Sequence, residues 1–365
     1  MGMIRLLLAS SVVFAHSSTI AGYFGIPSFA AVTCFFIISG FYMGMIGTEK
    51  YVGSNRFLPF YSNRFLRLYP TYLIALVFGL SVRLYLAQNE WLNSDGFGRD
   101  GRSFFPSGMS VISRGLLTIP NLTLIGTDVT YLFHYGVHSG WHFTFGESMP
   151  ALGDAQRTSQ YLLISPSWSI GLELWFYLLV PFLICYRTAS LVVIALLSIT
   201  LRLLMELSMP WSSYYFFPAN LGCFVMGILA YRAYRSAWYK CFATRSRVHV
   251  VFWFMLASLV FRQYIPFYRN YSWQLYLLLS VTLPFLFDAS KNCSLDRWVG
   301  NLSYPVYIIH EPILRFLDRC LGVKGGLAAL TATLAFSAVI LMLVEQPLDR
   351  FRQRRCRMAF NCKAA

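Results

Sequence analysis

The stretch "SFAAVTCFFIISGFYMGMIG", residues 28–47, decides the fold class, because no charged side chain interrupts its twenty consecutive positions. A helix needs about 20 apolar residues to cross the hydrocarbon core of a membrane. Only 12% of the whole chain is charged, whereas a water-soluble chain has about 25%. We read about ten runs of this kind, near 4–24, 28–47, 68–88, 161–185, 188–207, 214–232, 248–266, 272–288, 299–318 and 326–344.

These runs predict an all-α integral membrane protein, a bundle of about ten transmembrane helices. The run at 161–185 contains two prolines, so it is the one that we expect to be broken or re-entrant. We expect one membrane domain at 1–350, with an outer loop at about 89–160, followed by a basic cytoplasmic tail at 351–365.

The net charge of +15 would suit nucleic acid, but its distribution indicates topology instead. Lys and Arg concentrate after the second, fourth, sixth, eighth and tenth runs, while the connection at 89–160 carries four arginines against six acidic residues. This alternation follows the positive-inside rule with both termini cytoplasmic. We therefore expect no nucleic-acid partner.

The connection at 89–160 is long enough to form a lid or a binding loop, and its pattern favours a short helix near 110–119. Its His134, His138 and His142 have a four-residue spacing that on a helix would suit a metal. Glycines at 136 and 140 interrupt that helix, so we expect no metal site. The eight cysteines include no C-x-x-C pair, which argues against a disulfide framework or a zinc cluster.

Arg5 and His16 stand at opposite ends of the first apolar run. They are eleven positions apart, so on a helix they project from nearly one face, about 16 Å apart along the axis. Ionisable groups at membrane depth face a protein interior or a water-filled cavity. This face is therefore expected to line a passage, with Arg5 at the cytoplasmic edge for an anionic donor and His16 placed for proton transfer. The alternative is an orientation anchor at Arg5 and a hydrogen-bonded His16 within the bundle.

Arg64 and Arg67 lie one helical turn apart, just before Pro70, which suits a helix start. Two guanidiniums at the inner membrane face would make a phosphate clamp, because each offers forked donors to phosphoryl oxygens. The alternative is that both residues serve only the positive-inside pattern.

Ser169, Glu173 and Tyr177 recur at four-residue steps and form one polar stripe in an apolar run. A carboxylate at this depth needs a partner, for which His16 and the arginines are the candidates. Glu173 would then orient a base or organise the site, or it would be a buried polar tie between helices. Ser39, next to Gly40 in the second run, suits close helix packing.

His310 lies late in the ninth run, near the outer face, on the helical side of Ser303 and Tyr307. Glu345 precedes the basic tail and is expected to pair with Arg350. The chain contains neither a phosphate-binding G-x-x-x-x-G-K-[ST] motif nor a G-x-S-x-G motif, so nucleotide hydrolysis and a hydrolase-type serine lack support.

Together and in this order, these residues resemble the acyltransferase-3 family of bacterial integral-membrane O-acyltransferases. The resemblance covers about 1–350. It is carried by Arg5 with His16, "FFIISGF", the R-x-x-R-x-x-P of Arg64, Arg67 and Pro70, "SWSIGLELWFY" with Glu173, "FPANLGCFVMGILAY", "SYPVYIIH" with His310, and "EQP".

The resemblance implies a multi-pass protein of the bacterial inner membrane that uses cytoplasmic acyl-CoA, usually acetyl-CoA, as donor substrate and has no permanently bound cofactor. The acyl group would go to a hydroxyl of a cell-surface or exported polysaccharide, glycolipid or lipid-linked oligosaccharide. Membrane lipid and other polysaccharide-assembly proteins are the further partners expected. The acceptor would be met by the membrane domain and its outer loop.

By the same resemblance, His16 would be the catalytic base or an acyl relay, and Glu173 an essential polar support. Arg5, Arg64 and Arg67 would bind the CoA phosphates. A rival interpretation is a transporter or flippase of a lipid-linked sugar, which would also have many spans, buried charges and a large outer loop. The cytoplasmic donor site distinguishes the two, because a transporter has no need of CoA.

Overall fold

A computed structural model describes residues 1–17, 25–51, 57–88, 105–106, 108–143, 155–264 and 272–360. Most of these residues are helical. The longer helices are α1 (Gly2–His16), α2 (Ser28–Glu49), α3 (Phe57–Gln88), α4 (Val111–Thr123), α5 (Ser167–Leu183), α6 (Thr188–Ser208), α8 (Phe217–Arg235), α10 (Arg245–Val260), α12 (Ser272–Ser290), α13 (Ser294–Cys320), α14 (Gly326–Ile340) and α15 (Gln346–Phe360). Two short helices, α7 (Pro210–Tyr215) and α9 (Ala237–Phe242), connect longer ones.

The described helices give the chain the character of a multi-pass membrane protein. Four segments are both long enough and apolar enough to cross a membrane: Ser28–Glu49, Phe57–Leu86, Thr188–Ser208 and Gly326–Arg355. Two shorter apolar helices accompany them, Gly2–His16 and Ser167–Leu183. Each of the ten apolar runs contains a described helix, while the count of ten spans and the cytoplasmic termini stay predictions.

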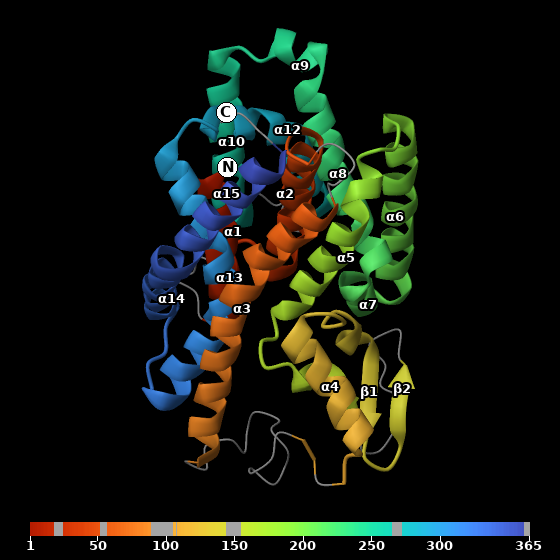
Figure 1. Ribbon diagram of the computed structural model, residues 1–365, viewed down its shortest axis with the longest axis vertical. Helices are drawn as coiled ribbons and strands as arrows, with labels where there is room; N and C mark the ends of the chain where they lie inside the picture. Colours follow the sequence, from red (N-terminus) through yellow and green to blue (C-terminus); the bar gives the residue numbers. More distant parts are fainter. Residues whose placement is uncertain are drawn as a thin grey trace.

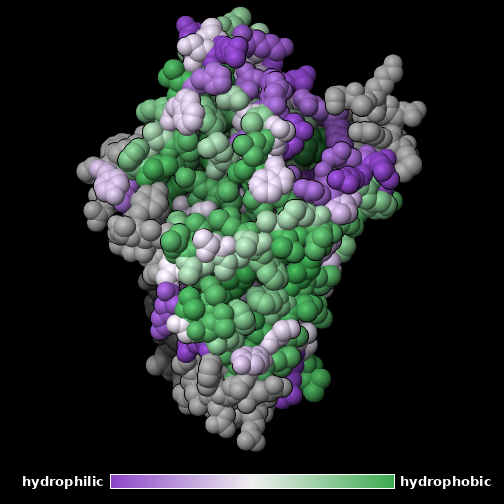
Figure 2. All heavy atoms as spheres, turned by 90° about the vertical axis from the view of Figure 1, so that its left-hand side faces the viewer, coloured by the Kyte–Doolittle hydropathy of each residue, from purple (hydrophilic) through white to green (hydrophobic). Residues whose placement is uncertain are grey.

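Different elements lie at the two ends of the molecule. Helices α9 and α15 lie toward one end, and α4 with strands β1 and β2 lies at the other (Figure 1). Figure 2 shows a broad hydrophobic band around the middle of one face, with hydrophilic side chains concentrated above it. Such a band is the surface that a bilayer covers.

Helix α2 lies at the centre of the bundle and packs closely against α8. A Cβ added to Gly40 would lie 1.9 Å from the carbonyl oxygen of Phe224, and one added to Gly227 would lie 2.0 Å from that of Ile37. The two glycines therefore let the backbones touch, as the small residue next to Ser39 predicted.

Helix α1 is anchored to α13 at its first turn. The carboxylate of Asp296 accepts hydrogen bonds from the Met1 amine at 2.8 Å, from the Gly2 N–H at 2.7 Å and from the Met3 N–H at 2.9 Å. The first N–H groups of a helix have no partner within the helix, and a carboxylate there also suits the helix dipole. This contact sets the depth of every side chain along α1.

Two sequence expectations about prolines have different outcomes. The run at 161–185 is interrupted at its first proline alone, because α5 begins at Ser167, directly after Pro166, and continues unbroken through Pro181. The prediction that Pro70 starts a helix is wrong, since α3 begins at Phe57 and carries Pro70 in its interior. Prolines are tolerated inside membrane helices where neighbouring groups bond to the backbone around them. Close to Pro70, Tyr304 of α13 donates to the Leu68 carbonyl at 2.7 Å.

The outer segment contains a small antiparallel sheet that the all-α expectation did not include. Strand β1 (Phe133–Gly136) pairs with β2 (Gly140–Phe143) on one edge and with β3 (Gln156–Arg157) on the other. Single-turn 3-10 helices η1 (Val129–Leu132) and η2 (Thr158–Tyr161) flank it. The helix expected near 110–119 is present as α4. Residues 89–104, 107 and 144–154 of the expected loop lie outside the described residues.

Candidate active site

Two cavities open inside the bundle. The inner cavity has a volume of about 270 Å³. Its polar lining is Arg5, Ser39, Tyr42, Arg64, Arg67, Ser169, Glu173, Tyr177, Asn301, Ser303, Tyr304, Tyr307, Asp349 and Arg352, and apolar residues that include Val32 line the rest. The outer cavity measures about 220 Å³ and is lined by Val12, His16, Ser28, Val32, Tyr131, Ser165, Pro166, Trp168, Tyr214, Tyr215, Tyr307, His310 and Glu311.

Helix α1 contributes to both cavities, as its two ionisable residues predicted. Arg5 lines the inner cavity and His16 lines the outer one. Among the described residues, the two cavities share Val32 and Tyr307 as lining residues, so they adjoin at these two side chains, and the continuous passage stays a prediction. Tyr307 is held in this shared wall by a 2.7 Å contact between its hydroxyl and that of Ser169.

Arg67 is neutralised within the inner cavity. Its Nη1 lies 2.7 Å from Oε2 of Glu345, and Thr71 donates to Oε1 of the same carboxylate at 2.8 Å. The expected pairing of Glu345 with Arg350 is therefore wrong. The reason is that Glu345 and Arg350 are five residues apart, a spacing that does not place two side chains on one face of a helix. Glu345 ends the π-helical turn η4 (Leu341–Glu345) between α14 and α15.

Arg64 and Arg5 are bound more weakly. Arg64 lies 5.9 Å from the ring centre of Tyr177, and its Nη1 is 3.9 Å from the sulfur of Met43. Arg5 lies 5.9 Å from the ring centre of Tyr42. Among the described residues, no carboxylate forms an ion pair with either guanidinium. The inner cavity thus holds two guanidiniums that are free to bind an anionic ligand.

Glu173 is bound by hydroxyl groups and not by the partners that the sequence suggested. Its Oε1 accepts from Ser39 at 2.7 Å and from Tyr177 at 2.5 Å. The expectation of His16 as its partner is wrong, because Glu173 lines the inner cavity while His16 lines the outer one. Glu173 therefore organises the inner cavity and does not orient His16 directly.

Two residues of α15 line the inner cavity although the sequence placed them at the boundary of a plain basic tail. Arg352 donates to Asp349 at 2.5 Å, and both face the cavity. Sequence reasoning missed them because Arg352 is one of several arginines in this region and only packing selects one of them. Their helical spacing of three residues was the one available signal.

The outer cavity brings two imidazoles together. The ring centres of His16 and His310 are 5.3 Å apart. Nδ1 of His310 lies 2.6 Å from the carbonyl oxygen of Tyr307. Because a carbonyl only accepts, Nδ1 carries the proton and Nε2 keeps its lone pair. This Nε2 is buried with no hydrogen-bond partner among the described residues.

Aromatic rings form the opposite wall of the outer cavity. Tyr131 and Tyr215 stack with 3.9 Å between ring centres and 9° between planes. The ring centre of Trp168 lies 4.5 Å from that of Tyr214 and 4.7 Å from that of Tyr215. Flat faces of this kind beside imidazoles and a carboxylate suit a ligand with both apolar ring faces and hydroxyl groups.

Asp128 lies behind this wall, in the outer segment between α4 and η1. Its Oδ1 would be 2.9 Å from a Cβ placed on Gly171 of α5, and it has no hydrogen-bond partner among the described residues. Burial raises the pKa of this carboxyl to about 6. Asp128 therefore titrates near neutral pH, which the sequence did not suggest.

The three outer histidines do not form a helix. His134 on β1 faces His142 on β2 across the hairpin, and His138 lies in the turn between the strands. Within the described ranges, no group of three or more His, Cys, Asp or Glu residues could hold a metal ion. The six cysteines whose side chains are described are free thiols.

A family model identifies the class of protein. Residues 1–344 match the family model described as an acyltransferase domain. The chain therefore belongs to the acyltransferase 3 family, and the protein is a membrane acyltransferase. Neither the curated proteins nor the solved structures include a match to the chain.

Proposed function

We propose that this acyltransferase moves an acyl group, acetyl above all, from cytoplasmic acyl-CoA to a hydroxyl of a cell-surface or exported polysaccharide or glycolipid. The bacterial inner membrane is its proposed location, with other polysaccharide-assembly proteins as neighbours. The observation that carries this proposal is the pair of cavities of opposite chemistry that meet at Tyr307.

The inner cavity suits the donor. Coenzyme A carries phosphate groups at one end and a thioester at the other, and Arg64 and Arg5 offer guanidiniums without a carboxylate partner among the described residues. Arginine binds phosphoryl oxygens through two parallel hydrogen bonds. The thioester arm would then extend past Glu173 toward the shared wall at Tyr307.

The outer cavity suits the acceptor. Sugar rings have apolar faces that pack on aromatic side chains, and Trp168, Tyr214 and Tyr215 supply such faces beside His16 and His310. The carboxylate of Glu311 in the same cavity is already held by the Ser165 N–H at 2.7 Å and by Arg315 at 2.9 Å. Because Glu311 is already held, the acceptor hydroxyl would approach the imidazoles of His16 and His310.

The chemistry needs a base and a donor for the oxyanion. In one route an imidazole, for which His16 is the first candidate, takes the proton of the acceptor hydroxyl. The oxygen of that hydroxyl attacks the thioester carbon in the same step. The C–S bond then breaks, and the CoA thiolate leaves and takes up a proton. In the other route the imidazole nitrogen attacks first and carries the acyl group briefly before the acceptor oxygen takes it. The hydroxyls of Tyr307 and Ser169 lie at the boundary, where either can donate to the oxyanion.

The direct test uses purified protein in detergent, acetyl-CoA and the surface polysaccharide of a strain that lacks the gene. We expect release of CoA thiol that depends on the polysaccharide, together with new O-acetyl groups detected by mass spectrometry. Absence of both would exclude the proposal. A transporter or flippase would move the lipid-linked sugar without consuming acetyl-CoA, and membership of the acyltransferase family favours the transferase over that alternative.

A further inference from the structure

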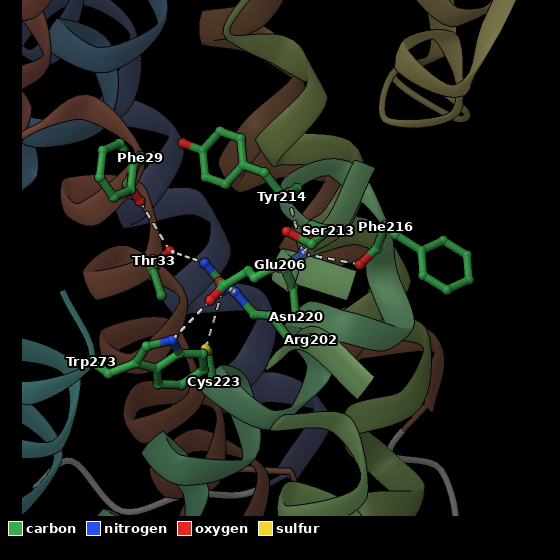
Figure 3. Close-up of polar contacts among 10 residues, drawn as sticks. All are labelled: Phe29, Thr33, Arg202, Glu206, Ser213, Tyr214, Phe216, Asn220, Cys223 and Trp273. Atoms are coloured by element: carbon green, nitrogen blue, oxygen red, sulfur yellow. Dashed lines mark hydrogen bonds and ion pairs between the residues drawn. The ribbon is translucent and has the colours of Figure 1, made fainter. Parts of the chain in front are cut away.

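Arg202 is a buried cation that lines neither cavity. It lies in the second half of α6 and is 3% exposed. Its Nε donates to Glu206 at 2.9 Å, its Nη1 to Oδ1 of Asn220 at 2.8 Å and its Nη2 to Thr33 at 3.4 Å (Figure 3). An arginine that is buried at membrane depth and held by several hydrogen bonds is a candidate for a functional role.

Asn220 connects Arg202 to the short helix α7. The Asn220 side chain is fully buried, and its Nδ2 donates to the carbonyl oxygens of Ser213 at 3.1 Å, Tyr214 at 3.1 Å and Phe216 at 2.9 Å (Figure 3). The last carbonyls of a helix have no partner within it. The Asn220 amide therefore holds the C-terminal end of α7 in place.

Arg202 fixes which way this amide points. A guanidinium only donates, so it contacts the oxygen of Asn220 and leaves the NH₂ group directed at α7. Without that donor, the amide oxygen would be buried without the guanidinium that now satisfies it, and the side chain would be held less firmly against α7. The order of contacts thus gives Arg202 an indirect hold on the backbone of α7.

Helix α7 in turn supplies two of the rings of the outer cavity, Tyr214 and Tyr215. Tyr215 stacks on Tyr131, and Trp168 lies against both α7 rings. A shift of α7 would therefore open the aromatic wall of the outer cavity while the inner cavity, which α7 does not line, would keep its shape.

We propose that Arg202 and Asn220 are positioning residues for the acceptor, because they hold α7 so that Tyr214 and Tyr215 form its binding wall. This inference rests on the proposed function of the outer cavity. The polar network of Arg202 and Asn220 would raise the affinity for the acceptor without contacting either substrate. It would not affect the affinity for the donor.

The test variant is Asn220→Asp. It keeps an oxygen for Arg202 but replaces the NH₂ that three carbonyls share with an oxygen that repels them. With the unmodified polysaccharide as acceptor and acetyl-CoA as donor, we expect the KM for polysaccharide to rise about tenfold, the worth of roughly one lost aromatic contact. The KM for acetyl-CoA should not change.

The matched control is Ser198→Ala in the same interface between α6 and α8. Ser198 donates to the Pro218 carbonyl at 2.6 Å and accepts from the Gly222 N–H at 2.7 Å, so its hydrogen bonds do not reach α7. We expect both KM values to stay as in the wild type. An equal rise of both in Asn220→Asp, or no rise for polysaccharide, would overturn the proposal.

Hydrogen exchange supplies a second readout that does not depend on activity. In Arg202→Lys, which keeps a positive charge but loses the forked donors, the amides of 211–216 should exchange faster while those of α6 and α8 stay protected. Unchanged exchange in 211–216 would overturn the hold of Arg202 on α7. If the wild-type protein transfers no acyl group, the proposed function fails, whereas this measurement still decides the α7 contact.

Discussion

The inner and outer cavities share the helices α1, α2, α5 and α13, yet they differ in chemistry. Helix α1 gives Arg5 to one and His16 to the other, and α13 gives Tyr304 to one and His310 to the other. The inner cavity concentrates guanidiniums and carboxylates, while the outer one combines imidazoles with stacked rings. Under the proposed function, each cavity would take one substrate, and about three turns of α1 would separate the two ligand classes.

The wall between the cavities has a chemical consequence. Under the proposed function, the thioester in the inner cavity and the acceptor in the outer one would meet at this wall, where the Tyr307 and Ser169 hydroxyls lie 2.7 Å apart. Excluding water protects an activated acyl group from hydrolysis.

The largest effect that would test this division of roles comes from His16→Ala. We expect acetyl transfer to fall by about 10²–10⁴-fold, the usual contribution of a positioned base, while acyl-CoA binding at the inner cavity is retained. Mass spectrometry of the polysaccharide gives the first value and calorimetry with a non-reactive thioester analogue gives the second. Wild-type transfer would remove His16 from the mechanism, and lost donor binding would show that the cavities do not act separately.

Arg67→Ala should act on stability more than on binding. It leaves the carboxylate of Glu345, 4% exposed as a side chain, without its counterion, and breaking a buried pair costs about 3–5 kcal/mol. We expect a lower unfolding temperature in detergent. The double variant with Glu345→Gln should recover most of the loss, and an unchanged unfolding temperature in the single variant would contradict the ion pair.

Asp128 should make the free energy of unfolding depend on pH. Its pKa is raised by burial from 3.8 to about 6, so the folded state binds this proton more tightly than the unfolded state. The stabilisation is complete below pH 4 and is lost as the pH rises through 6, by about 3 kcal/mol in total. Asp128→Asn should therefore match the wild type at pH 4 and exceed its unfolding temperature at pH 7. A constant difference between the two proteins across this range would refute the assignment.

The smallest expected effect is that of Arg64→Ala. Because Arg64 has no carboxylate partner among the described residues, its loss should leave the unfolding temperature unchanged. We expect the KM for acetyl-CoA to rise about tenfold, the worth of one charge-assisted contact to phosphate, with the polysaccharide KM unaltered. A rise confined to the polysaccharide would reverse the assignment of the two cavities.

Much of this arrangement was readable from the sequence, and the failures have physical reasons. Apolar runs locate helices because the bilayer demands them, and the eleven-residue spacing of Arg5 and His16 put them at opposite depths of one helix. The partners of Glu173 and Glu345 were not readable, because hydroxyl groups and arginines recur on several helices. The pairing depends on how the helices rotate about their axes.

The sequence by itself determined the membrane class, the positions of the helices and the ionisable residues that the bundle has to accommodate. Only the tertiary structure decided that these residues fall into two cavities, that Tyr307 separates them, and that α15 contributes Arg352 to the inner one. The reason is that hydrophobicity is a property of each segment alone, whereas the contact of two side chains requires a fixed register between helices that lie far apart in the chain.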